Sequence, residues 1–257
     1  MGSALLNGVI EAGMIKPESV FLMEIDAKKR DLLRERLGIN LCGTVGELAR
    51  ECKTMVLAVK PQVLPAVLGE VETEITTEHL LISLAAGMSL SALEELIPQG
   101  RFVRVMPNTP ARIRRGVTAY AVGKNVTTNE VEQVEAIFGC VGRVLSIPEH
   151  LMDAVTAISG SGPAYVYYMI EALIDSGVLL GLGREQAQTL ALETFIGAAE
   201  MLKQTEEHPA KLRAEVTSPG GTTAAGILEL EKAGVAGIVM TAAQAAARRS
   251  AELARKY

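Results

Sequence analysis

This chain has few of the side chains that metal sites and catalytic triads require. Its cysteines and histidines number three each: Cys42, Cys52, Cys140, His79, His150 and His208. None has the spacing of a metal site or a triad, so we expect no metal ion and assign the histidines no catalytic role. An odd number of cysteines without such spacing is typical of reduced thiols in a cytoplasmic protein.

Long apolar runs and a strong charge are also missing. No run approaches the roughly 20 residues of a membrane span, and no signal peptide is visible at the start. The net charge of −5 gives no reason to expect nucleic acid or an anionic membrane as a partner. With 49% hydrophobic and 21% charged residues among 257, the composition predicts a globular chain of one or two domains.

Short apolar strands alternate with helical patterns in the first half of the chain. We expect strands at 20–23, 55–59, 80–84, 102–106, 117–122 and 143–147. Helices are expected between most of them, at 26–36, 45–51, 89–96 and 129–138. Strands that are apolar throughout and separated by helices indicate a mostly parallel sheet covered on both faces. The sequence therefore predicts an α/β class protein with a Rossmann-like domain over residues 1–148.

The pattern changes near Pro148, and no strand is evident from Leu151 onward. Apolar residues recur on one helical face around 187–202 and again around 235–246. We therefore predict an all-α domain over residues 149–257. These helices are too apolar for the surface of a monomer, so we expect an intertwined homodimer or a multiple of dimers with each active site at the interface. The pattern of the last helix alone also fits packing within its own domain.

The segment Val216-Thr217-Ser218-Pro219-Gly220-Gly221-Thr222-Thr223 lies between helical patterns at 209–215 and 222–233. Pro219 cannot continue a helix, and paired glycines permit backbone angles that are closed to other residues. Thr222 or Thr223 can cap the next helix with a hydroxyl. Free backbone N–H groups at that helix start would suit a carboxylate. An ordinary helix–turn–helix connection explains the same residues.

The end of the strand expected at 20–23, which would be the second strand of a complete dinucleotide fold, carries a clue to cofactor choice. An acidic residue at the end of this strand typically accepts hydrogen bonds from the adenosine ribose hydroxyls. Glu24 and Asp26 both lie near that point, and Asp26 is better explained as a helix N-cap. The charge of Glu24 would repel the 2′-phosphate of NADP, which slightly favours NAD. The following cations, Lys28, Lys29 and Arg30, could offset that effect.

Other strand ends carry further candidates for cofactor binding. Lys60, in Ala58-Val59-Lys60-Pro61, is placed at the carboxyl end of the sheet, where open α/β folds bind ligands. Pro61 suits the first position of a helix. Small residues at Ala85-Ala86-Gly87 would let a flat nicotinamide approach, although packing or a turn at Gly87 more often explains such residues. Asn108, between two prolines, could bind a ligand, and fixing its own turn is the simpler role. The glycine-rich break at 159–163 brings backbone to a ligand or forms a kink between crossing helices.

Five ordered motifs resemble those of the pyrroline-5-carboxylate reductase family. They are Ala58-Val59-Lys60-Pro61, Ala85-Ala86-Gly87, Met106-Pro107-Asn108-Thr109-Pro110, Ser159-Gly160-Ser161-Gly162-Pro163-Ala164-Tyr165, and Glu207-His208-Pro209-Ala210 continuing through Val216–Thr223 to Leu228-Glu229. The resemblance spans nearly the whole chain. It implies reduction of a cyclic imine acid to proline by NADPH or NADH.

The resemblance also assigns roles to individual residues. Backbone N–H groups of Gly221 and Thr222 would hold the substrate carboxylate, and the Thr223 hydroxyl would orient the ring nitrogen as the catalytic contact. Val216 and Ser218 would complete the substrate loop, with Glu149 close to the substrate pocket. The cofactor contacts would come from the strand-end residues and from the start of the chain: Gly2, Ser3, Glu24, Ala58, Val59, Lys60, Pro61, Ala85, Ala86 and Asn108.

Two other classes of protein remain to be weighed. Another imine or 3-hydroxyacid dehydrogenase of similar architecture would be expected to place a lysine or aspartate on the first interdomain helix. The corresponding stretch, 151–172, has no lysine, and its only acids are Asp153 and Glu171. The other class is a non-catalytic nucleotide-binding dimer.

The start of the chain generates the first prediction. Met1-Gly2-Ser3-Ala4 already has a helix pattern and resembles the family just after its glycine loop, with Gly2 as the last loop glycine. The first strand and the other two glycines are missing, so we expect weak cofactor binding by the chain as written. Extension upstream by a strand and glycine loop should recover binding. Calorimetry with NADH and NADPH on both versions tests this, and equally tight binding by the shorter version would contradict it.

Overall fold

Five strands form the main sheet of the structure, a computed structural model that describes residues 1–254. Their order is β3 (Thr54–Leu57), β4 (Leu80–Ser83), β5 (Arg101–Pro107), β6 (Gly116–Val122) and β7 (Gly142–Ser146). Strands β3, β4 and β5 are parallel, β6 is antiparallel to β5, and β7 is parallel to β6. Two further strands, β1 (Phe21–Leu22) and β2 (Asn40–Leu41), form a separate parallel pair. The expected mostly parallel sheet is therefore confirmed.

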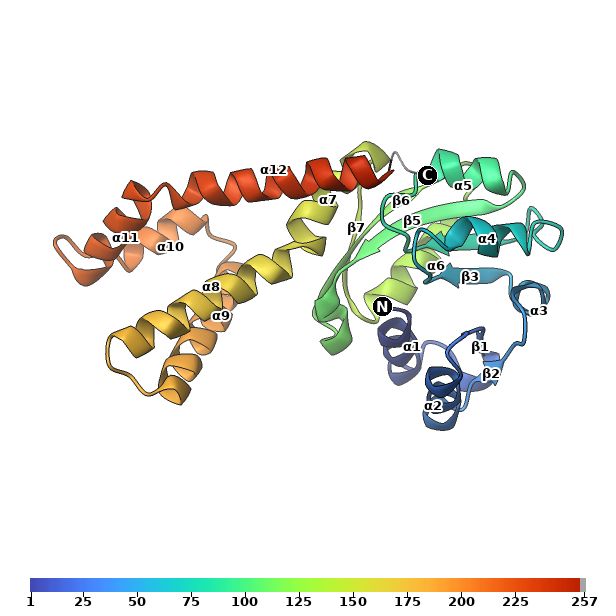
Figure 1. The fold of residues 1–257 in the computed structure, drawn as a ribbon, viewed down its shortest axis with the longest axis horizontal. Helices are drawn as coiled ribbons and strands as arrows, with labels where there is room; N and C mark the ends of the chain where they lie inside the picture. Colours follow the sequence, from blue (N-terminus) through green and yellow to red (C-terminus); the bar gives the residue numbers. More distant parts are fainter. Residues whose placement is uncertain (255–257) are drawn as a thin grey trace. The chain divides into compact units, whose positions relative to one another are not determined.

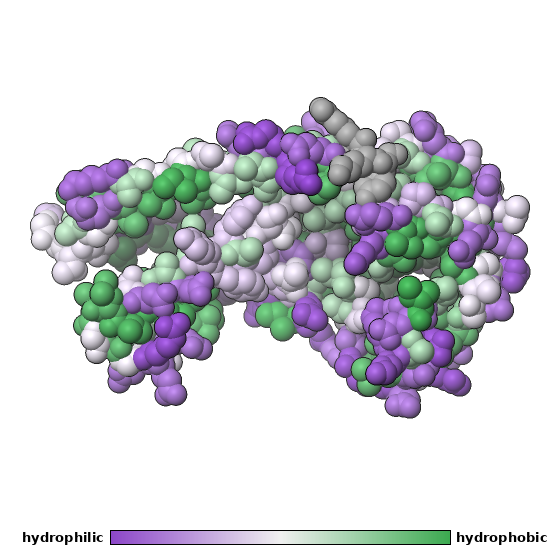
Figure 2. Space-filling model, in the orientation of Figure 1, coloured by the Kyte–Doolittle hydropathy of each residue, from purple (hydrophilic) through white to green (hydrophobic). Residues whose placement is uncertain are grey.

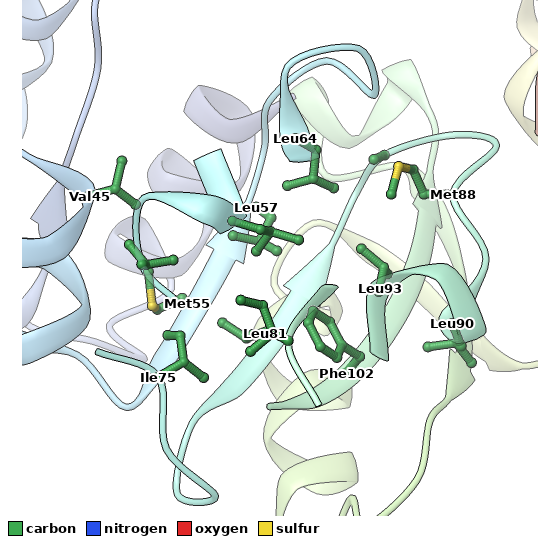
Figure 3. Packing of buried hydrophobic residues seen from close by; sticks show 14 of the residues in the cluster. Val45, Met55, Leu57, Leu64, Ile75, Leu81, Met88, Leu90, Leu93 and Phe102 are labelled. Carbon is green, nitrogen blue, oxygen red and sulfur yellow. The ribbon is translucent and has the colours of Figure 1, made fainter. Parts of the chain in front are cut away.

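Strand β4 lies between β3 and β5 and is buried on both faces. None of its four residues is more than 1% exposed. Because side chains alternate along a strand, Leu80 and Ile82 enter one apolar core while Leu81 enters the other. Figure 3 shows Leu81 packed with Leu57, Leu93 and Phe102 in the larger core. A strand that is apolar on both sides needs helices on both sides.

Two layers of helices cover the sheet (Figure 1). On one face, α1 (Gly2–Glu11) and α6 (Thr128–Gly139) contribute Leu5, Val9, Val134 and Phe138. On the other face lie α3 (Val45–Glu51), α4 (Leu64–Gly69) and α5 (Leu90–Leu96). Helix α2 (Ala27–Leu37) packs over β1 and β2 through a small third core. Short turns of helix at 17–19, 109–113 and 149–151 connect these elements.

The rest of the described chain is helical. After α7 (Met152–Val155) come α8 (Gly162–Leu179), α9 (Arg184–Thr205), α10 (Pro209–Glu215), α11 (Thr222–Lys232) and α12 (Val235–Ala254). The absence of strands after Leu151 is thus confirmed for the described residues. By its internal contacts the chain forms two units: Met1–Ser161 with the final segment from Ala245, and Gly162–Gln244. The functional domain limits 1–148 and 149–257 stay a prediction.

The helical unit, Gly162–Gln244, has almost no core of its own. Its only buried apolar residues are Ala187 and Ala191, in α9. Gly177 lets α8 approach α9 closely, since a Cβ at that position would lie 2.7 Å from the Cβ of Ala187. Figure 2 shows apolar side chains gathered on the outside of α8–α9 and of α11–α12. Those that are more than half exposed include Tyr167, Tyr168, Leu179, Leu180, Ile238 and Met240. Within residues 1–254, no helix combines the length and apolar character that crossing a membrane requires.

Two elements were not expected from the sequence, and one expected position was wrong. Strand β2 has only two residues and helix α4 has six, so neither is long enough to show a periodic pattern. Pro61 does not begin a helix. It lies in a turn in which the Lys60 carbonyl accepts from the N–H groups of Val63 and Leu64, and α4 starts only at Leu64.

Candidate functional site

The carboxyl ends of β3, β4 and β5 meet at one edge of the sheet because these strands are parallel. The segment Ala58–Pro61 follows β3, Ala85–Gly87 follows β4, and Asn108 follows β5. The fold therefore brings together, at one edge, most residues that the sequence analysis marked for cofactor binding. Open α/β folds bind their ligands at this edge.

The start of α1 lies at the same place. Gly2 is the first residue of the helix, and a Cβ there would lie 3.1 Å from the Cβ of Ala58. No side chain caps this helix start, and the first recorded amide bonds to Met1 come from Ala4 and Leu5. The N–H groups of Gly2 and Ser3 therefore stand at the positive end of a ten-residue helix. That arrangement fits an anionic group close to Ala58.

Glu24 follows β1, and its carboxylate is fixed. Its Oε1 atom accepts from the Asp26 N–H at 3.2 Å, and its Oε2 atom forms an ion pair with Lys29. Burial raises the pKa of Glu24, but the hydrogen bonds from Lys29 and from the Asp26 amide outweigh it and hold the pKa below its usual value. Asp26 caps α2 by accepting from the Lys29 N–H at 3.1 Å, which confirms its predicted N-cap role.

The loop after β4 turns at Gly87, where φ is +82°. Ala85 is buried and donates its N–H to Ser83 Oγ at 3.3 Å, whereas Ala86 is exposed. A Cβ at Gly87 would lie 3.3 Å from the backbone nitrogen of Ala254 in α12. The turn is confirmed, and it requires glycine both for its backbone angle and for the close approach of α12. Lys60 and Val59, after β3, are exposed.

Asn108 has a defined structural role. It is only 8% exposed, and its side-chain Oδ1 atom accepts from the Val117 N–H at 2.9 Å. This bond ties the end of β5 to the start of β6, so the turn-fixing interpretation is confirmed. The predicted cofactor contact of Asn108 stays a prediction.

Glu149 joins three separate elements. Its Oε1 atom accepts from the Leu90 N–H at 2.6 Å and lies 3.3 Å from an Nη atom of Arg104. Leu90 is the first residue of α5, directly after the Ala85–Gly87 loop, and Arg104 lies in β5. The negative charge of the carboxylate thus balances the positive end of α5 and the positive charge of the buried Arg104 guanidinium. Glu149 braces the loop after β4, a role that the sequence did not indicate.

The loop Val216–Thr223 forms as a tight turn before α11. Gly220 has a φ of +67°, the Gly221 N–H donates to the Ser218 carbonyl at 3.0 Å, and a Cβ at Gly221 would collide with Ser218 Oγ. Gly221 is the N-cap, with Thr222 and Thr223 as the first two helical residues. The expectation that Thr222 or Thr223 caps the helix is therefore wrong, because both residues lie within the first turn.

This geometry leaves polar groups free at the start of α11. The first recorded bond to the N-cap carbonyl comes from the Ala225 N–H, and within the described chain the N–H groups of Thr222 and Thr223 have no acceptor. Their hydroxyls also have no recorded partner, whereas Thr189, Thr194 and Thr217 donate to the carbonyl four residues earlier. The loop therefore presents two amides and two hydroxyls, with the exposed Val216 and Ser218 beside them.

The glycine-rich segment at 159–163 continues a helix through a change of winding. Residues 156–160 form a π-helical turn, in which the Ser161 N–H donates to the Thr156 carbonyl at 2.8 Å. A Cβ at Gly160 would lie 2.7 Å from Cε of Met106, near the end of β5. The segment is therefore a local distortion of the helix that lies close to the carboxyl edge of the sheet, and its approach to a ligand stays a prediction.

Comparison with known proteins defines the class first. Residues 1–87 match the family described as NADP oxidoreductase coenzyme F420-dependent, and residues 149–253 match pyrroline-5-carboxylate reductase dimerisation. A Rossmann-like sheet followed by a dimerisation domain defines an NAD(P)-dependent oxidoreductase that associates with itself.

Relatives over the whole chain define the family. The chain is 45% identical to pyrroline-5-carboxylate reductase of Synechocystis, over 100% of this chain and 96% of the relative. The Plasmodium falciparum pyrroline carboxylate reductase structure with NADP bound has a TM-score of 0.87 and 38% identity, covering 99% of this chain and 94% of that one. The Coxiella burnetii enzyme has a TM-score of 0.92 and 34% identity, covering 98% and 94%. This chain belongs to the pyrroline-5-carboxylate reductase family.

The position of Glu149 leads to a prediction about stability. Replacing Glu149 with alanine leaves the mostly buried Arg104 and the Leu90 amide without their acceptor, which should lower the free energy of unfolding by about 1–3 kcal/mol. Asp31→Ala is the matched control, because Asp31 pairs with Arg30 at the surface and such pairs contribute about 0–1 kcal/mol. Urea unfolding of both variants measures the difference. Equal losses in both variants would show that Glu149 has no bracing role.

Proposed function

We propose that this chain reduces 1-pyrroline-5-carboxylate to L-proline by hydride transfer from NADPH or NADH, the last step of proline biosynthesis. Membership of the family over the full length of the chain is the observation that carries the proposal. The two groups of candidate residues, one at the sheet edge and one at the start of α11, match the two reactants of such an enzyme.

The cofactor side of the site consists of backbone and small side chains. The N–H groups of Gly2 and Ser3 would hold the pyrophosphate, since they lie at a helix start beside Ala58. Val59, Lys60 and Pro61 would contact the nucleotide along the next loop. The small side chains of Ala85 and Ala86 would leave room for the nicotinamide, while Asn108 fixes the neighbouring turn. When bound, the cofactor supplies the hydride.

The substrate-binding part of the site needs groups that hold the substrate carboxylate and orient its ring. The imine carbon of the substrate is electrophilic once its nitrogen is protonated, so the chain mainly has to align it with the cofactor. Such alignment contributes about 7–11 kcal/mol for a well-placed pair. The free N–H group of Thr222 would receive the carboxylate at the positive end of α11. The neighbouring Gly221 N–H, which donates to the Ser218 carbonyl at 3.0 Å, would be shared with the carboxylate. Val216 and Ser218 would shape the loop around the ring.

Thr223 is proposed to orient the ring nitrogen. Its hydroxyl is half-buried and has no recorded partner among the described residues, so it is free to make a hydrogen bond to substrate. A hydroxyl has too high a pKa to act as a strong general acid, so its contribution is orientation. This role depends on the same helix start that would bind the carboxylate.

Replacing Thr223 with valine tests this role. The change removes the hydroxyl and keeps the shape, and loss of one such hydrogen bond should cost about 1–3 kcal/mol, or about 5- to 150-fold in turnover of the cyclic imine. Cofactor affinity should stay nearly constant. Steady-state kinetics with varied imine and varied cofactor separate the two effects, with the variant and its control made in the version extended upstream by the strand and glycine loop.

Thr222→Val is the matched control, because Thr222 is assigned its backbone N–H and its side chain is exposed. It should lower turnover less than Thr223→Val. Full turnover in Thr223→Val would mean that other groups orient the nitrogen. A chain that binds cofactor but forms no proline at all would contradict the proposed function itself.

A homodimer, or a multiple of dimers, is the proposed assembly. The helical unit buries only Ala187 and Ala191, while Tyr168, Leu179 and Leu180 are 74%, 88% and 83% exposed. Apolar surface of this extent is stable in water when a second copy covers it. Light scattering at micromolar concentration should therefore give at least twice the mass of one chain. A stable monomer would contradict this prediction.

The proposal includes no partner other than the small-molecule substrate and a second copy. The net charge of −5 offers no attraction to nucleic acid or to an anionic membrane. A cytoplasmic location is proposed from the cysteines, which are all free thiols in the structure.

A further inference from the structure

Asp153, one of the two acids in the stretch 151–172, has a structural partner. Its Oδ1 atom accepts a hydrogen bond of 2.6 Å from the Ser250 hydroxyl, which lies 97 positions further along the chain. Ser250 is only 6% exposed. A hydrogen bond from a hydroxyl to a carboxylate is among the strong ones in proteins, and burial keeps water from competing for it. The bond therefore fixes the end of α12 to the first turn of α7.

The face of α12 that carries Ser250 consists of small side chains. Ala246, Ala247 and Ala254 lie three or four positions from Ser250, so they share its face of the helix, and all three are half-buried. Small side chains let the helix backbone approach its neighbour closely. A Cβ at Gly87 would lie 3.3 Å from the backbone nitrogen of Ala254 and 3.4 Å from its Cα atom. The end of α12 therefore rests directly on the glycine turn that follows β4.

That turn is held at its start, at its exit and at Gly87 itself. At its start, the Ala85 N–H donates to Ser83 Oγ at 3.3 Å. At its exit, Glu149 accepts from the first amide of α5. At Gly87, the backbone of α12 packs on the turn, and Asp153 holds α12 there. One short segment of the chain, from Glu149 to Asp153, thus fixes both the exit of the turn and the helix that packs on it.

This glycine turn needs restraint. Gly87 has a φ of +82°, and glycine has a wider choice of backbone angles than any other residue. The small side chains of Ala85 and Ala86 are proposed to leave room for the nicotinamide. Hydride transfer requires close alignment of the reacting atoms, and a misplacement of about 1 Å can lower the rate on the order of 100-fold. A loop that moves would therefore lower the rate even with the rest of the cofactor in place.

We propose that Asp153 and Ser250 are positioning residues for the nicotinamide. Their hydrogen bond holds the end of α12 on Gly87 and thereby keeps Ala85–Gly87 in the conformation that receives the ring. Neither side chain is assigned a contact with cofactor or substrate. The inference rests on the proposed function only in that a nicotinamide binds at this loop. It makes the end of α12 a support of the nucleotide-binding site.

Hydrogen exchange on the full chain without cofactor tests the support of the loop. Ser250→Ala removes the hydroxyl, and loss of this hydrogen bond should let the amides of residues 85–90 exchange about fivefold faster or more. Exchange in β6 and α6 should stay unchanged, which shows that the variant is folded. Mass spectrometry of peptides that contain each segment measures these rates.

Further variants identify the hydrogen bond as the cause. Asp153→Ala should accelerate exchange of the same amides, and combining it with Ser250→Ala should add nothing to either change. Asp153→Asn keeps an oxygen that accepts from the Ser250 hydroxyl, so it should retain most of the protection. Glu252→Ala is the matched control, because Glu252 lies at the same end of α12 and its recorded partner is Arg249 at the surface. Its exchange should equal that of the unmodified chain.

Binding measurements separate positioning of the nicotinamide from general support of the fold. Calorimetry compares NADH with ADP-ribose, and NADPH with 2′-phospho-ADP-ribose, in the version extended upstream by the strand and glycine loop. The members of each pair differ only in the nicotinamide ring, so the ratio of their dissociation constants cancels the contacts of the adenosine half. Ser250→Ala should weaken the dinucleotide about threefold or more and leave the fragment within about 1.5-fold. Turnover of the cyclic imine at saturating cofactor should fall about tenfold or more.

Unchanged exchange in Ser250→Ala, an equal change in Glu252→Ala, or faster exchange with an unchanged ratio would overturn the inference. A chain that forms no proline but shows both shifts would leave the inference standing and contradict only the proposed reaction. Proline formation without these shifts would do the reverse. The two proposals therefore fail separately.

Discussion

The burial of β4 on both faces is the constraint on which the nucleotide-binding unit depends. Because Leu81 faces one core while Leu80 and Ile82 face the other, helices must cover both sides of the sheet. Parallel strands also require crossover connections, which return the chain to the edge of the sheet where the previous strand began. The carboxyl ends of β3, β4 and β5 consequently meet at one edge, and the loops with Lys60, Ala86 and Asn108 gather there. The site is thus a consequence of how the sheet is buried, and Glu149 adds a brace between this edge and the start of α5.

The helical unit has the opposite character, because its apolar side chains face outward. A chain that buries only Ala187 and Ala191 across 162–244 has too little internal core for independent stability. Self-association therefore belongs to the folding of this unit as much as to its function. The turn before α11, with Gly220, Gly221 and the free amides of Thr222 and Thr223, is built on these helices. The proposed substrate contacts consequently depend on the same association.

Sequence patterns predicted most of the elements, since long periodic segments such as 187–202 and 235–246 carry their own signal. They missed β2 and α4, which are too short for a period, and misplaced the cap of α11. In that turn Gly221 takes the N-cap position because the backbone passes too close to Ser218 for a side chain.

The sequence also could not predict roles that depend on contacts between residues far apart in the chain. The link from Glu149 to Leu90 spans 59 positions in sequence, and the pairing of Glu24 with Lys29 depends on where α2 places that side chain.

The central claim is that hydride passes directly from a nicotinamide cofactor to the imine carbon of a bound cyclic imino acid. Its most direct test follows the hydrogen itself, by incubating the chain with 1-pyrroline-5-carboxylate and NADPH or NADH deuterated at the reactive position of the nicotinamide. Mass spectrometry and NMR of the product should show proline with a single deuterium on the former imine carbon, in amounts equal to the cofactor oxidised. Proline without deuterium, deuterium at another carbon, or cofactor oxidation without proline would contradict the account.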